Sequence, residues 1–275
     1  MQDVVQTAFP TRNDTIRAMR DGHVATVTLN RPESLNALSG EMIAALSACL
    51  DDLAAESRVR VVVLRGAGAH FCAGHDLAQM TAHRGDGDGG RACYRRLFAD
   101  CSAMMQRIRS IPQPVIACVR GVATASGCQL VAACDLAIAA EDARFATSGV
   151  RLGLFCSTPL VELTRTLAPK HAMELLCTGA FIDARQAEAI GLVNRAVPEA
   201  RLDDEVAALA ATIAAHSPLA LATGKRLAQA QAGMTRDAAY ALAAETMADN
   251  MMSADAEAGI GAFLSKRPLP EWTGA

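Results

Sequence analysis

The stretch GVATASGCQLVAACD, residues 121–135, contains the residues best placed to do chemistry. The apolar runs PVIACVR and LAIAA flank it, which predicts two buried strands joined by a turn of small residues and a short helix. A helix that begins near Ser126 presents unpaired backbone N–H groups and a partial positive charge at its first turn. Such a turn suits a developing negative charge on a ligand. Tight packing of helix against sheet is the competing explanation for the small residues Gly121, Ala123, Ala125, Ser126 and Gly127.

A second candidate segment, GAGAHFCAGHDL, spans residues 66–77 and follows the uniformly apolar run VRVVVLRG. Ligands of open α/β folds approach backbone amides in loops at strand ends, so this glycine-containing loop is a candidate wall of the same site. The stretch HRGDGDGG, residues 83–90, follows it. Its composition is typical of a mobile surface loop beside the site, or of a slack connection.

The elements that position these loops read as strand, helix and strand. Residues 15–19 and 24–30 alternate in the strand manner around Asp21-Gly22, which predicts a β-hairpin. Ser39 is a candidate N-cap for the helix in GEMIAALSACLDDLAAES, and VRVVVLRG reads as a buried strand. This order implies a right-handed crossover onto a parallel sheet.

The second half of the chain is dominated by helix signals. Helical patterns follow residue 157, LVNRAVP is the last strand candidate, and only helices are predicted over residues 201–264. A break near residue 200 divides the chain into a core over residues 1–200 and a helical lobe over residues 201–275. The apolar faces of that lobe exceed what a monomer needs, which predicts self-association.

Composition excludes several classes of function. Hydrophobic residues form 51% of the 275 residues, charged residues 20%, and the net charge is −3, so no basic surface for nucleic acid or membrane is indicated. Nine cysteines without a Cys-x-x-Cys pair suit a reducing compartment and do not indicate a metal cluster. The N-terminus MQDVVQTAFPTRNDT lacks a signal or transit pattern, and no run has transmembrane length. We therefore expect a soluble, cytoplasmic protein.

Three segments in this order and at these separations carry a family resemblance: NRPESLNALS, HFCAGHDLAQM and GVATASGCQLVAACDLAIAA. They resemble the crotonase superfamily of enoyl-CoA hydratases and isomerases, and FATSGVRLGLFCSTP, GLVNRAVP and GAFLSKRPLPEW extend the likeness over nearly the whole chain. The combination GHDL, SGCQL and GLFCSTP is most similar to the mitochondrial enoyl-CoA hydratase domain-containing subgroup. The resemblance implies an α/β spiral of strand–strand–helix units with a C-terminal helical trimerisation lobe, assembled as a homotrimer or a hexamer of paired trimers.

The resemblance also implies the ligand, a bent acyl-CoA whose thioester oxygen lies between two backbone N–H groups. No covalently bound cofactor is expected. The amides correspond to His75 and Ser126. A thioester enolate concentrates its charge on one oxygen, and each well-placed donor stabilises such an oxyanion by roughly 3–4 kcal/mol. The residues expected to contact CoA are Arg31, Ala73, Gly74, Asp76, Leu77, Lys266 and Arg267.

Two positions depart from the family pattern. The hydratases use two glutamates to position and activate water, and the matching positions hold Gln129 and Gly149. Glutamine cannot accept a proton at neutral pH, and glycine has no side chain. General acid–base catalysis is worth about 10²- to 10⁴-fold per group, so ordinary hydration is expected to be absent or weak. Gln129 retains the capacity to orient a water molecule or hydrogen-bond an acyl group.

Other residues offer alternative chemistry. The His75 side chain is a candidate base, Cys156 and Ser157 are candidate nucleophiles, and Ser157 is also a candidate N-cap for the next helix. Helical spacing places Glu162 outside the pocket.

These residues leave three alternatives to hydration. The first is a different acyl-CoA reaction, such as isomerisation, decarboxylation or thioester hydrolysis. The second is a non-catalytic binding or assembly protein. The third is a Clp-type serine peptidase with Ser126 as nucleophile, although position 151, where its histidine is expected, holds Arg.

Overall fold

The main sheet begins with the hairpin predicted around Asp21-Gly22. In the computed structural model, which describes residues 7–275, β2 (Ile16–Asp21) pairs antiparallel with β3 (Val24–Leu29). β3 then pairs in parallel with β4 (Val61–Gly66), so the predicted crossover through α1 (Gly40–Ala55) is confirmed. The prediction that the chain lacks a targeting segment depends partly on residues 1–6, which lie outside the described residues.

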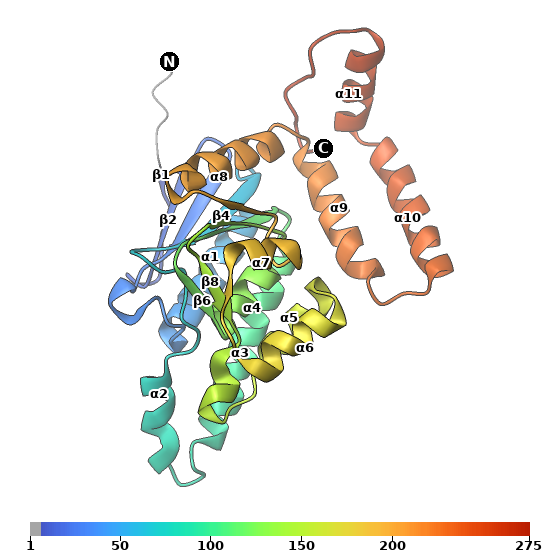
Figure 1. The fold of residues 1–275 in the computed structure, drawn as a ribbon. Coiled ribbons are helices and arrows are strands. Elements are labelled where there is room, and N and C mark those ends of the chain that lie inside the picture. Colours follow the sequence, from blue (N-terminus) through green and yellow to red (C-terminus); the bar gives the residue numbers. More distant parts are fainter. Residues whose placement is uncertain (1–6) are drawn as a thin grey trace.

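Seven strands form this sheet in the order β1-β2-β3-β4-β5-β7-β10. From β3 onward all neighbouring strands are parallel. The other strands of this sheet are β1 (Thr7–Ala8), β5 (Val115–Val119), β7 (Leu136–Ala140) and β10 (Arg195–Val197). Figure 1 shows the sheet at the centre of the molecule, with helices on both sides.

The uniform apolarity of β4 follows from burial on both faces. Val62 and Leu64 pack in the larger core with α1 and α3 (Arg91–Ser110). Val61 and Val63 point the other way and pack with α8 (Glu199–Ala214). Successive strand residues alternate between faces, so a strand covered on both sides has no polar positions.

A second, three-stranded sheet lies beside the first and was not predicted from the sequence. It consists of β6 (Val122–Thr124), β8 (Arg144–Ala146) and β9 (Ile182–Asp183). Its strands are two or three residues long, too short to show a periodic pattern. The residues read as a turn of small side chains therefore include a strand, and β6 leads directly into α4 (Ser126–Ala133).

The remaining elements before residue 201 are short helices. They are η1 (Pro32–Ser34), α2 (Leu77–Ala82), η2 (His83–Gly85), η3 (Ser148–Leu152), α5 (Ser157–Thr166), α6 (Pro169–Thr178) and α7 (Ala184–Ala189). The N-cap predicted at Ser39 is confirmed, since its side chain accepts a hydrogen bond from the Met42 N–H at 3.2 Å. The N-cap predicted at Ser157 is wrong: Ser157 is the first residue of α5, Cys156 takes the cap position, and no side chain caps this helix.

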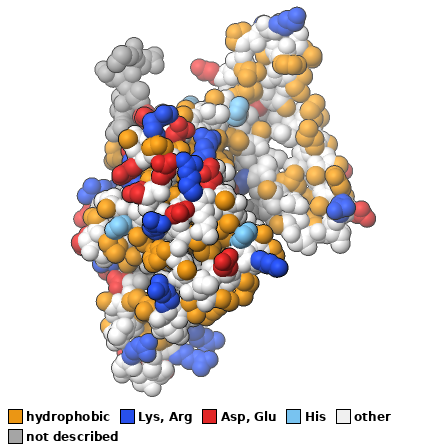
Figure 2. Space-filling view, viewed as in Figure 1, with side chains coloured by type: hydrophobic (Ala, Val, Ile, Leu, Met, Phe, Trp, Pro, Cys, Tyr) orange, Lys and Arg blue, Asp and Glu red, His pale blue; other side chains and the backbone are white. Residues whose placement is uncertain are grey.

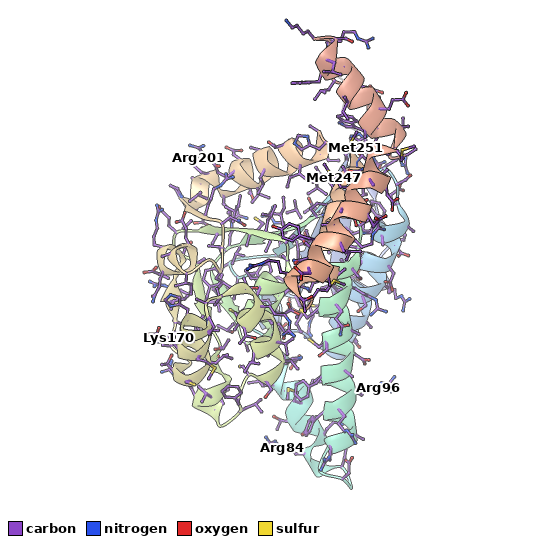
Figure 3. The ribbon with its side chains drawn as sticks, turned by 90° about the vertical axis from the view of Figure 1, so that its right-hand side faces the viewer. Arg84, Arg96, Lys170, Arg201, Met247 and Met251 are labelled. Carbon is purple, nitrogen blue, oxygen red and sulfur yellow. The ribbon has the colours of Figure 1, made fainter. Side chains whose placement is uncertain are left out.

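The helices after residue 201 fall into two groups. α8 packs on the sheet, whereas α9 (Pro218–Gln231), α10 (Arg236–Met251) and α11 (Ala254–Leu264) project from it as a helical lobe (Figure 1). Figure 3 shows Met247 and Met251 along α10, and their exposed fractions are 65% and 52%. Hydrophobic side chains are also spread over the lobe in Figure 2. The division at residue 201 stays a prediction.

The buried ammonium group of Lys225 fixes α9 to the core. The Lys225 Nζ lies 2.7 Å from the Asp135 carboxylate and donates to the carbonyl oxygens of Ile108 at 2.8 Å and Gln113 at 2.9 Å. Only 6% of the lysine side chain is exposed. Among residues 7–275 no single helix has the length and apolarity of a membrane span, although α8 and α9, bent by 102°, satisfy the length and composition test as a pair.

Candidate active site

A strained residue starts α4. Ala125, which joins β6 to this helix, has φ 49° and ψ −117°, a region that residues with a Cβ rarely occupy. Its N–H donates to the Ala146 carbonyl oxygen of β8 at 2.9 Å, so the second sheet holds the strained turn in place. Strain of this kind costs about 1–3 kcal/mol and concentrates at functional sites. The turn directs the first amides of α4 away from the strand.

The loop that carries His75 crosses in front of this turn. Gly74, with φ +96°, and Asp76 bracket His75 through hydrogen bonds to Leu38: the Leu38 N–H donates to the Gly74 oxygen at 2.7 Å, and the Asp76 N–H to the Leu38 oxygen at 3.1 Å. A Cβ on Gly74 would lie 3.0 Å from the Ala125 Cβ and 3.4 Å from the Ser126 nitrogen. Glycine is therefore required for this close approach.

The two predicted oxyanion amides lack protein acceptors. In the part of the chain that the structure describes, no hydrogen bond uses the backbone N–H of His75 or of Ser126. Backbone N–H groups normally have a hydrogen-bond partner, so these two, which lie close together, are available for a ligand atom. Their donor character and the start of α4 both favour negative charge there.

A cavity of about 270 Å³ opens in front of these residues. Its walls come from the His75 loop, α2, α3, the start of α4, η3 and the start of α5, and they are mainly apolar. The lining residues are Ala73, His75, Leu77, Met80, Phe98, Ala125, Ser126, Ser148, Gly149, Leu152, Leu154, Phe155, Cys156, Ser157, Thr158 and Pro159. Leu77, Leu152 and Phe155 are 41–69% exposed at its mouth. No aspartate or glutamate is among these lining residues.

The structure brings the side chains of His75 and Ser126 together. The Ser126 Oγ lies 3.1 Å from the His75 Nδ1, and His75 Nε2 is buried without a partner. The sequence offers the His75 side chain as a candidate base and Ser126 as a candidate peptidase nucleophile, besides their backbone amides, but it does not predict that the two side chains pair. The two residues lie 51 positions apart, and no local pattern indicates that they meet.

Burial keeps His75 neutral. Its ring packs edge to face on Phe98, with centroids 5.3 Å apart and planes at 86°. Loss of solvent lowers the pKa of His75 from 6.5 to about 4. At neutral pH the imidazole therefore carries one proton and one free lone pair.

Gln129 lies on the other side of α4. It is 2% exposed, its Oε1 has no hydrogen-bond partner, and it lines a neighbouring cavity of about 710 Å³ together with Arg109, Glu162 and Thr158. Thr158 is shared with the first cavity. Glu162, predicted to lie outside the pocket, is 5% exposed, and its carboxylate pairs with the Arg109 guanidinium at 3.1 Å. This carboxylate is thus bound to a cation and does not line the cavity of His75.

At Gly149 there is no room for a side chain. A Cβ there would overlap the Leu154 carbonyl oxygen and lie 2.8 Å from the Cys156 Sγ. The Leu154 N–H donates to the Gly149 oxygen at 2.9 Å, which closes the loop over this position. The backbone, and not only the residue type, therefore excludes a glutamate here.

The two other candidate nucleophiles differ in exposure. Cys156 is 7% exposed, and burial raises the pKa of its thiol, while a hydrogen bond from the Gly149 N–H opposes that rise. Ser157 is exposed, and its hydroxyl donates to the Phe155 oxygen at 3.4 Å. Both line the cavity, but within the described residues neither side chain forms a hydrogen bond with a histidine.

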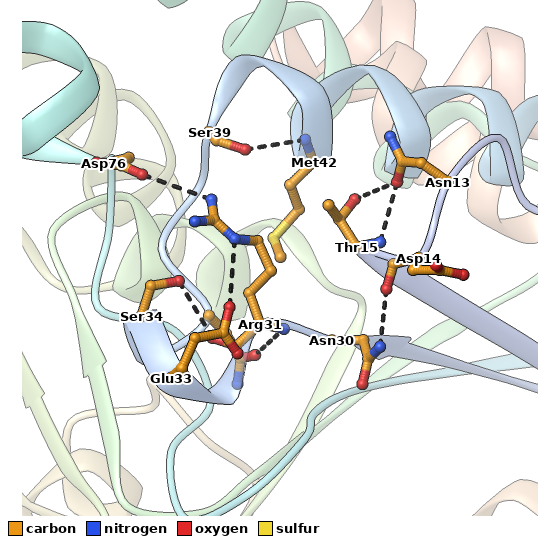
Figure 4. A network of polar contacts seen from close by, with 11 residues as sticks. Asn13, Asp14, Thr15, Asn30, Arg31, Glu33, Ser34, Ser39, Met42 and Asp76 are labelled. Atoms are coloured by element: carbon orange, nitrogen blue, oxygen red, sulfur yellow. Dashed lines mark hydrogen bonds and ion pairs between the residues drawn. The ribbon is translucent and has the colours of Figure 1, made fainter.

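The predicted CoA contacts lie in two separate places. Arg31 is near the cavity: its guanidinium pairs with Asp76 at 3.5 Å and with Glu33 at 3.6 Å (Figure 4). Asp76 also caps α2 by accepting from the Gln79 N–H at 3.1 Å. Lys266 and Arg267 are exposed beyond α11, and within residues 7–275 their side chains take part in no hydrogen bond or ion pair.

Comparison with known proteins assigns this arrangement to a family. The profile described as Enoyl-CoA hydratase/isomerase matches residues 19–275. The enoyl-CoA hydratase domain-containing protein 3, mitochondrial, of Danio rerio is 41% identical over 254 residues, which cover 92% of this chain and 86% of the relative. The crystal structure of the human domain-containing protein 3 is 38% identical, with a TM-score of 0.86 and coverage of 93% and 99%. An enoyl-CoA hydratase structure from Mycobacterium smegmatis is 49% identical, with a TM-score of 0.90 and coverage of 94% and 99%.

Proposed function

The chain belongs to the enoyl-CoA hydratase/isomerase family, and from this premise we propose that it binds short acyl-CoA thioesters in the cavity at His75 and Ser126. The observation that carries the proposal is the pair of unused backbone N–H groups facing an apolar cavity. An acyl chain fits the leucine and phenylalanine walls, and the thioester oxygen accepts from both amides. Charge that develops on this oxygen is stabilised by donors already in position.

Ordinary hydration of an enoyl thioester is not supported by these side chains. The lining residues include no carboxylate, Gln129 faces the neighbouring cavity, and a side chain at Gly149 would overlap its surroundings. A water molecule in this cavity has no general base of the family's kind. We therefore propose a binding site that polarises the thioester carbonyl and hydrates crotonyl-CoA poorly.

Two measurements test the proposal separately. Calorimetric titration with butyryl-CoA is expected to show saturable binding, with free CoA binding more weakly because the acyl chain contributes apolar burial. With a ¹³C-labelled thioester carbonyl, the infrared stretch of the bound ligand is expected at lower frequency than in water, because two amide donors polarise the bond. The absence of binding at millimolar ligand would refute the ligand assignment.

Hydration is tested with crotonyl-CoA. The expected turnover is at least 10²-fold below a typical kcat of about 10 s⁻¹, since acid–base groups are missing. Turnover near that typical value contradicts the loss of hydration without affecting the binding result. Gly224→Ala, on the exposed face of α9 with open space around it, serves as a control variant that leaves the cavity intact.

Self-association through the projecting lobe forms the second part of the proposal. α9 and α10 contain no buried hydrophobic residue, and the exposed apolar residues of the lobe include Met247, Met252, Phe263 and Leu264 at 65–87% exposure. We propose a homotrimer or a hexamer of paired trimers, which covers these side chains. Native mass spectrometry is expected to show three or six copies, and a monomer at micromolar concentration contradicts it.

A further inference from the structure

The available hydrogen-bond partners decide whether Ser126 or His75 is the donor in the contact between them. If the serine hydroxyl donates to Nδ1, the only orphan atom is the buried Nε2–H. If Nδ1–H donates instead, Nε2 lacks a donor and the serine proton lacks an acceptor among residues 7–275. Each unpaired buried polar group costs about 1–3 kcal/mol, so the first arrangement is favoured. The serine hydroxyl therefore points at a neutral imidazole lone pair.

The surroundings of this pair match the needs of a nucleophilic serine. Ser126 is the first residue of α4, so its oxygen lies in the positive field of the helix start. Its own N–H and that of His75 lack protein acceptors in the described chain. Serine hydrolases likewise combine a hydroxyl, a histidine and an oxyanion hole that includes the amide of the nucleophile. Here Ser126 and His75 together supply the hydroxyl, the imidazole and the two backbone N–H groups.

We propose that Ser126 is an acyl-accepting nucleophile and His75 its general base, which gives the site an acyl-CoA thioester hydrolase activity. This inference rests on the proposed acyl-CoA ligand. In the first step the Ser126 Oγ bonds to the thioester carbonyl carbon, its proton passes to His75 Nδ1, and negative charge forms on the carbonyl oxygen between the two amides. The carbon–sulfur bond then breaks, and the departing CoA sulfur takes the proton from His75. The product is an ester of Ser126 and free CoA thiol.

The second step returns the serine. A water molecule gives a proton to His75 Nδ1 and attacks the ester carbon, and the Ser126 oxygen leaves and recovers the proton from His75. The sum is one thioester and one water converted to one carboxylic acid and one thiol. No carboxylate is required in the cavity, which agrees with a lining that contains none. Phe98 holds the imidazole ring by an edge-to-face contact in place of a third polar residue.

Competing nucleophiles are less suited to this role. Burial raises the pKa of the Cys156 thiol, and within the described residues this thiol forms no hydrogen bond with a base. Ser157 directs its hydroxyl to the Phe155 oxygen. In contrast, the Ser126 hydroxyl has His75 as its partner at 3.1 Å. The residue that carries an acyl adduct therefore identifies which of the three is the nucleophile.

The experiment uses the full chain with butyryl-CoA. The protein is quenched in acid at timed intervals, its intact mass is measured, and the modified peptide is sequenced. Free CoA is quantified by chromatography rather than with a thiol reagent, because exposed Cys177 would react with that reagent. The expected result is a mass gain of one acyl group on Ser126, with CoA released at least in equal amount.

Variants make the result specific. Ser126→Ala is expected to lose the adduct and the CoA release while binding butyryl-CoA in calorimetry. His75→Asn retains a hydrogen-bond acceptor but not a base, and is expected to slow acylation by about 10²-fold or more. Ser110→Ala, a remote exposed serine on α3, is the matched control with unchanged acylation.

Three outcomes overturn the inference. An adduct on Cys156 or Ser157 assigns the chemistry to another residue. Calorimetric binding of butyryl-CoA without any adduct or CoA release shows that the ligand assignment holds and the covalent step does not occur. Absence of binding removes the proposed function and this inference together. Circular dichroism of Ser126→Ala, a change of one hydroxyl, verifies that the comparison is between folded proteins.

Discussion

A Cβ atom on Gly149 would lie 2.8 Å from the Sγ of Cys156 and would also overlap the Leu154 carbonyl oxygen. Real Cβ atoms do not approach other heavy atoms so closely, and the backbone of this loop cannot yield as a side chain can. The absence of a glutamate at this position therefore reflects the conformation of the loop and not only the change of residue type.

Gly149→Glu is therefore expected to destabilise the protein without restoring hydration. Overpacking of a buried position costs about 1–3 kcal/mol, and the carboxylate adds a desolvation cost. Denaturant unfolding and crotonyl-CoA turnover are the two measurements. The matched control is Gly224→Ala in α9, which meets nothing within 4 Å and is expected to stabilise the helix by about 1 kcal/mol. A stable Gly149→Glu variant with gained hydratase activity contradicts the prediction.

Protonation of His75 is expected to destabilise the fold in mild acid. Burial lowers its pKa from 6.5 to about 4, so between these values the unfolded chain binds a proton that the folded chain does not. The free energy of unfolding then falls as the pH decreases from 6.5 to 4, by up to about 3 kcal/mol, and this contribution is constant below pH 4. Urea unfolding of wild type and His75→Asn across this range isolates the effect. If the free energy of unfolding depends on pH equally in the two proteins, protonation of His75 is not the cause.

The same titration sets the pH profile of the proposed acylation. The base must be neutral to accept the serine proton, so the acylation rate rises with pH through about 4 and is level near neutrality. Timed mass spectrometry of the acyl adduct at several pH values measures this profile. A rate that still rises steeply between pH 6 and 7 points to a different base.

The strained turn at Ala125 tolerates glycine and excludes branched residues. With φ 49° and ψ −117°, a β-branched side chain at this position would be strained, and the Ala125 Cβ already faces Gly74. We expect Ala125→Val to lower the free energy of unfolding by about 2 kcal/mol or more and to weaken butyryl-CoA binding. Ala125→Gly is expected to stay within about 1 kcal/mol of wild type, because relief of strain offsets the added flexibility of the unfolded chain. Equal effects of both variants would argue against backbone strain as the cause.

Removal of the buried ammonium of Lys225 is expected to loosen the lobe from the core. Lys225→Met leaves two carbonyl oxygens of buried residues without their donor, which costs about 1–3 kcal/mol, whereas the exposed Asp135 carboxylate is hydrated after the cation is lost. Thermal unfolding measures the loss. Arg96→Ala breaks the exposed pair with Asp100 at 3.9 Å and is expected to change stability by less than about 0.5 kcal/mol, because water screens that pair. A loss no larger than that of Arg96→Ala would show that the buried ammonium group does not anchor α9.

The order and type of most elements were predictable because they depend on local patterns. The hairpin at Asp21-Gly22, the cap at Ser39, the buried strand at residues 61–66 and the helices after residue 201 follow from turn chemistry and hydrophobic periodicity. The strands of the second sheet were not predicted, because segments of two or three residues show no hydrophobic periodicity. Their pairing is between segments far apart in the chain, and only tertiary contacts stabilise it.

By itself, the sequence determined the residue types at the site: two loops able to present backbone amides, and Gln129 and Gly149 where the family has glutamates. Tertiary structure decided which groups meet. It placed Ser126 Oγ against His75 Nδ1, turned Gln129 toward Arg109 and Glu162, and closed the loop over Gly149. The physical reason is that hydrogen bonding, burial and steric exclusion at this site act between residues as far as 53 positions apart, whereas sequence patterns report only on near neighbours.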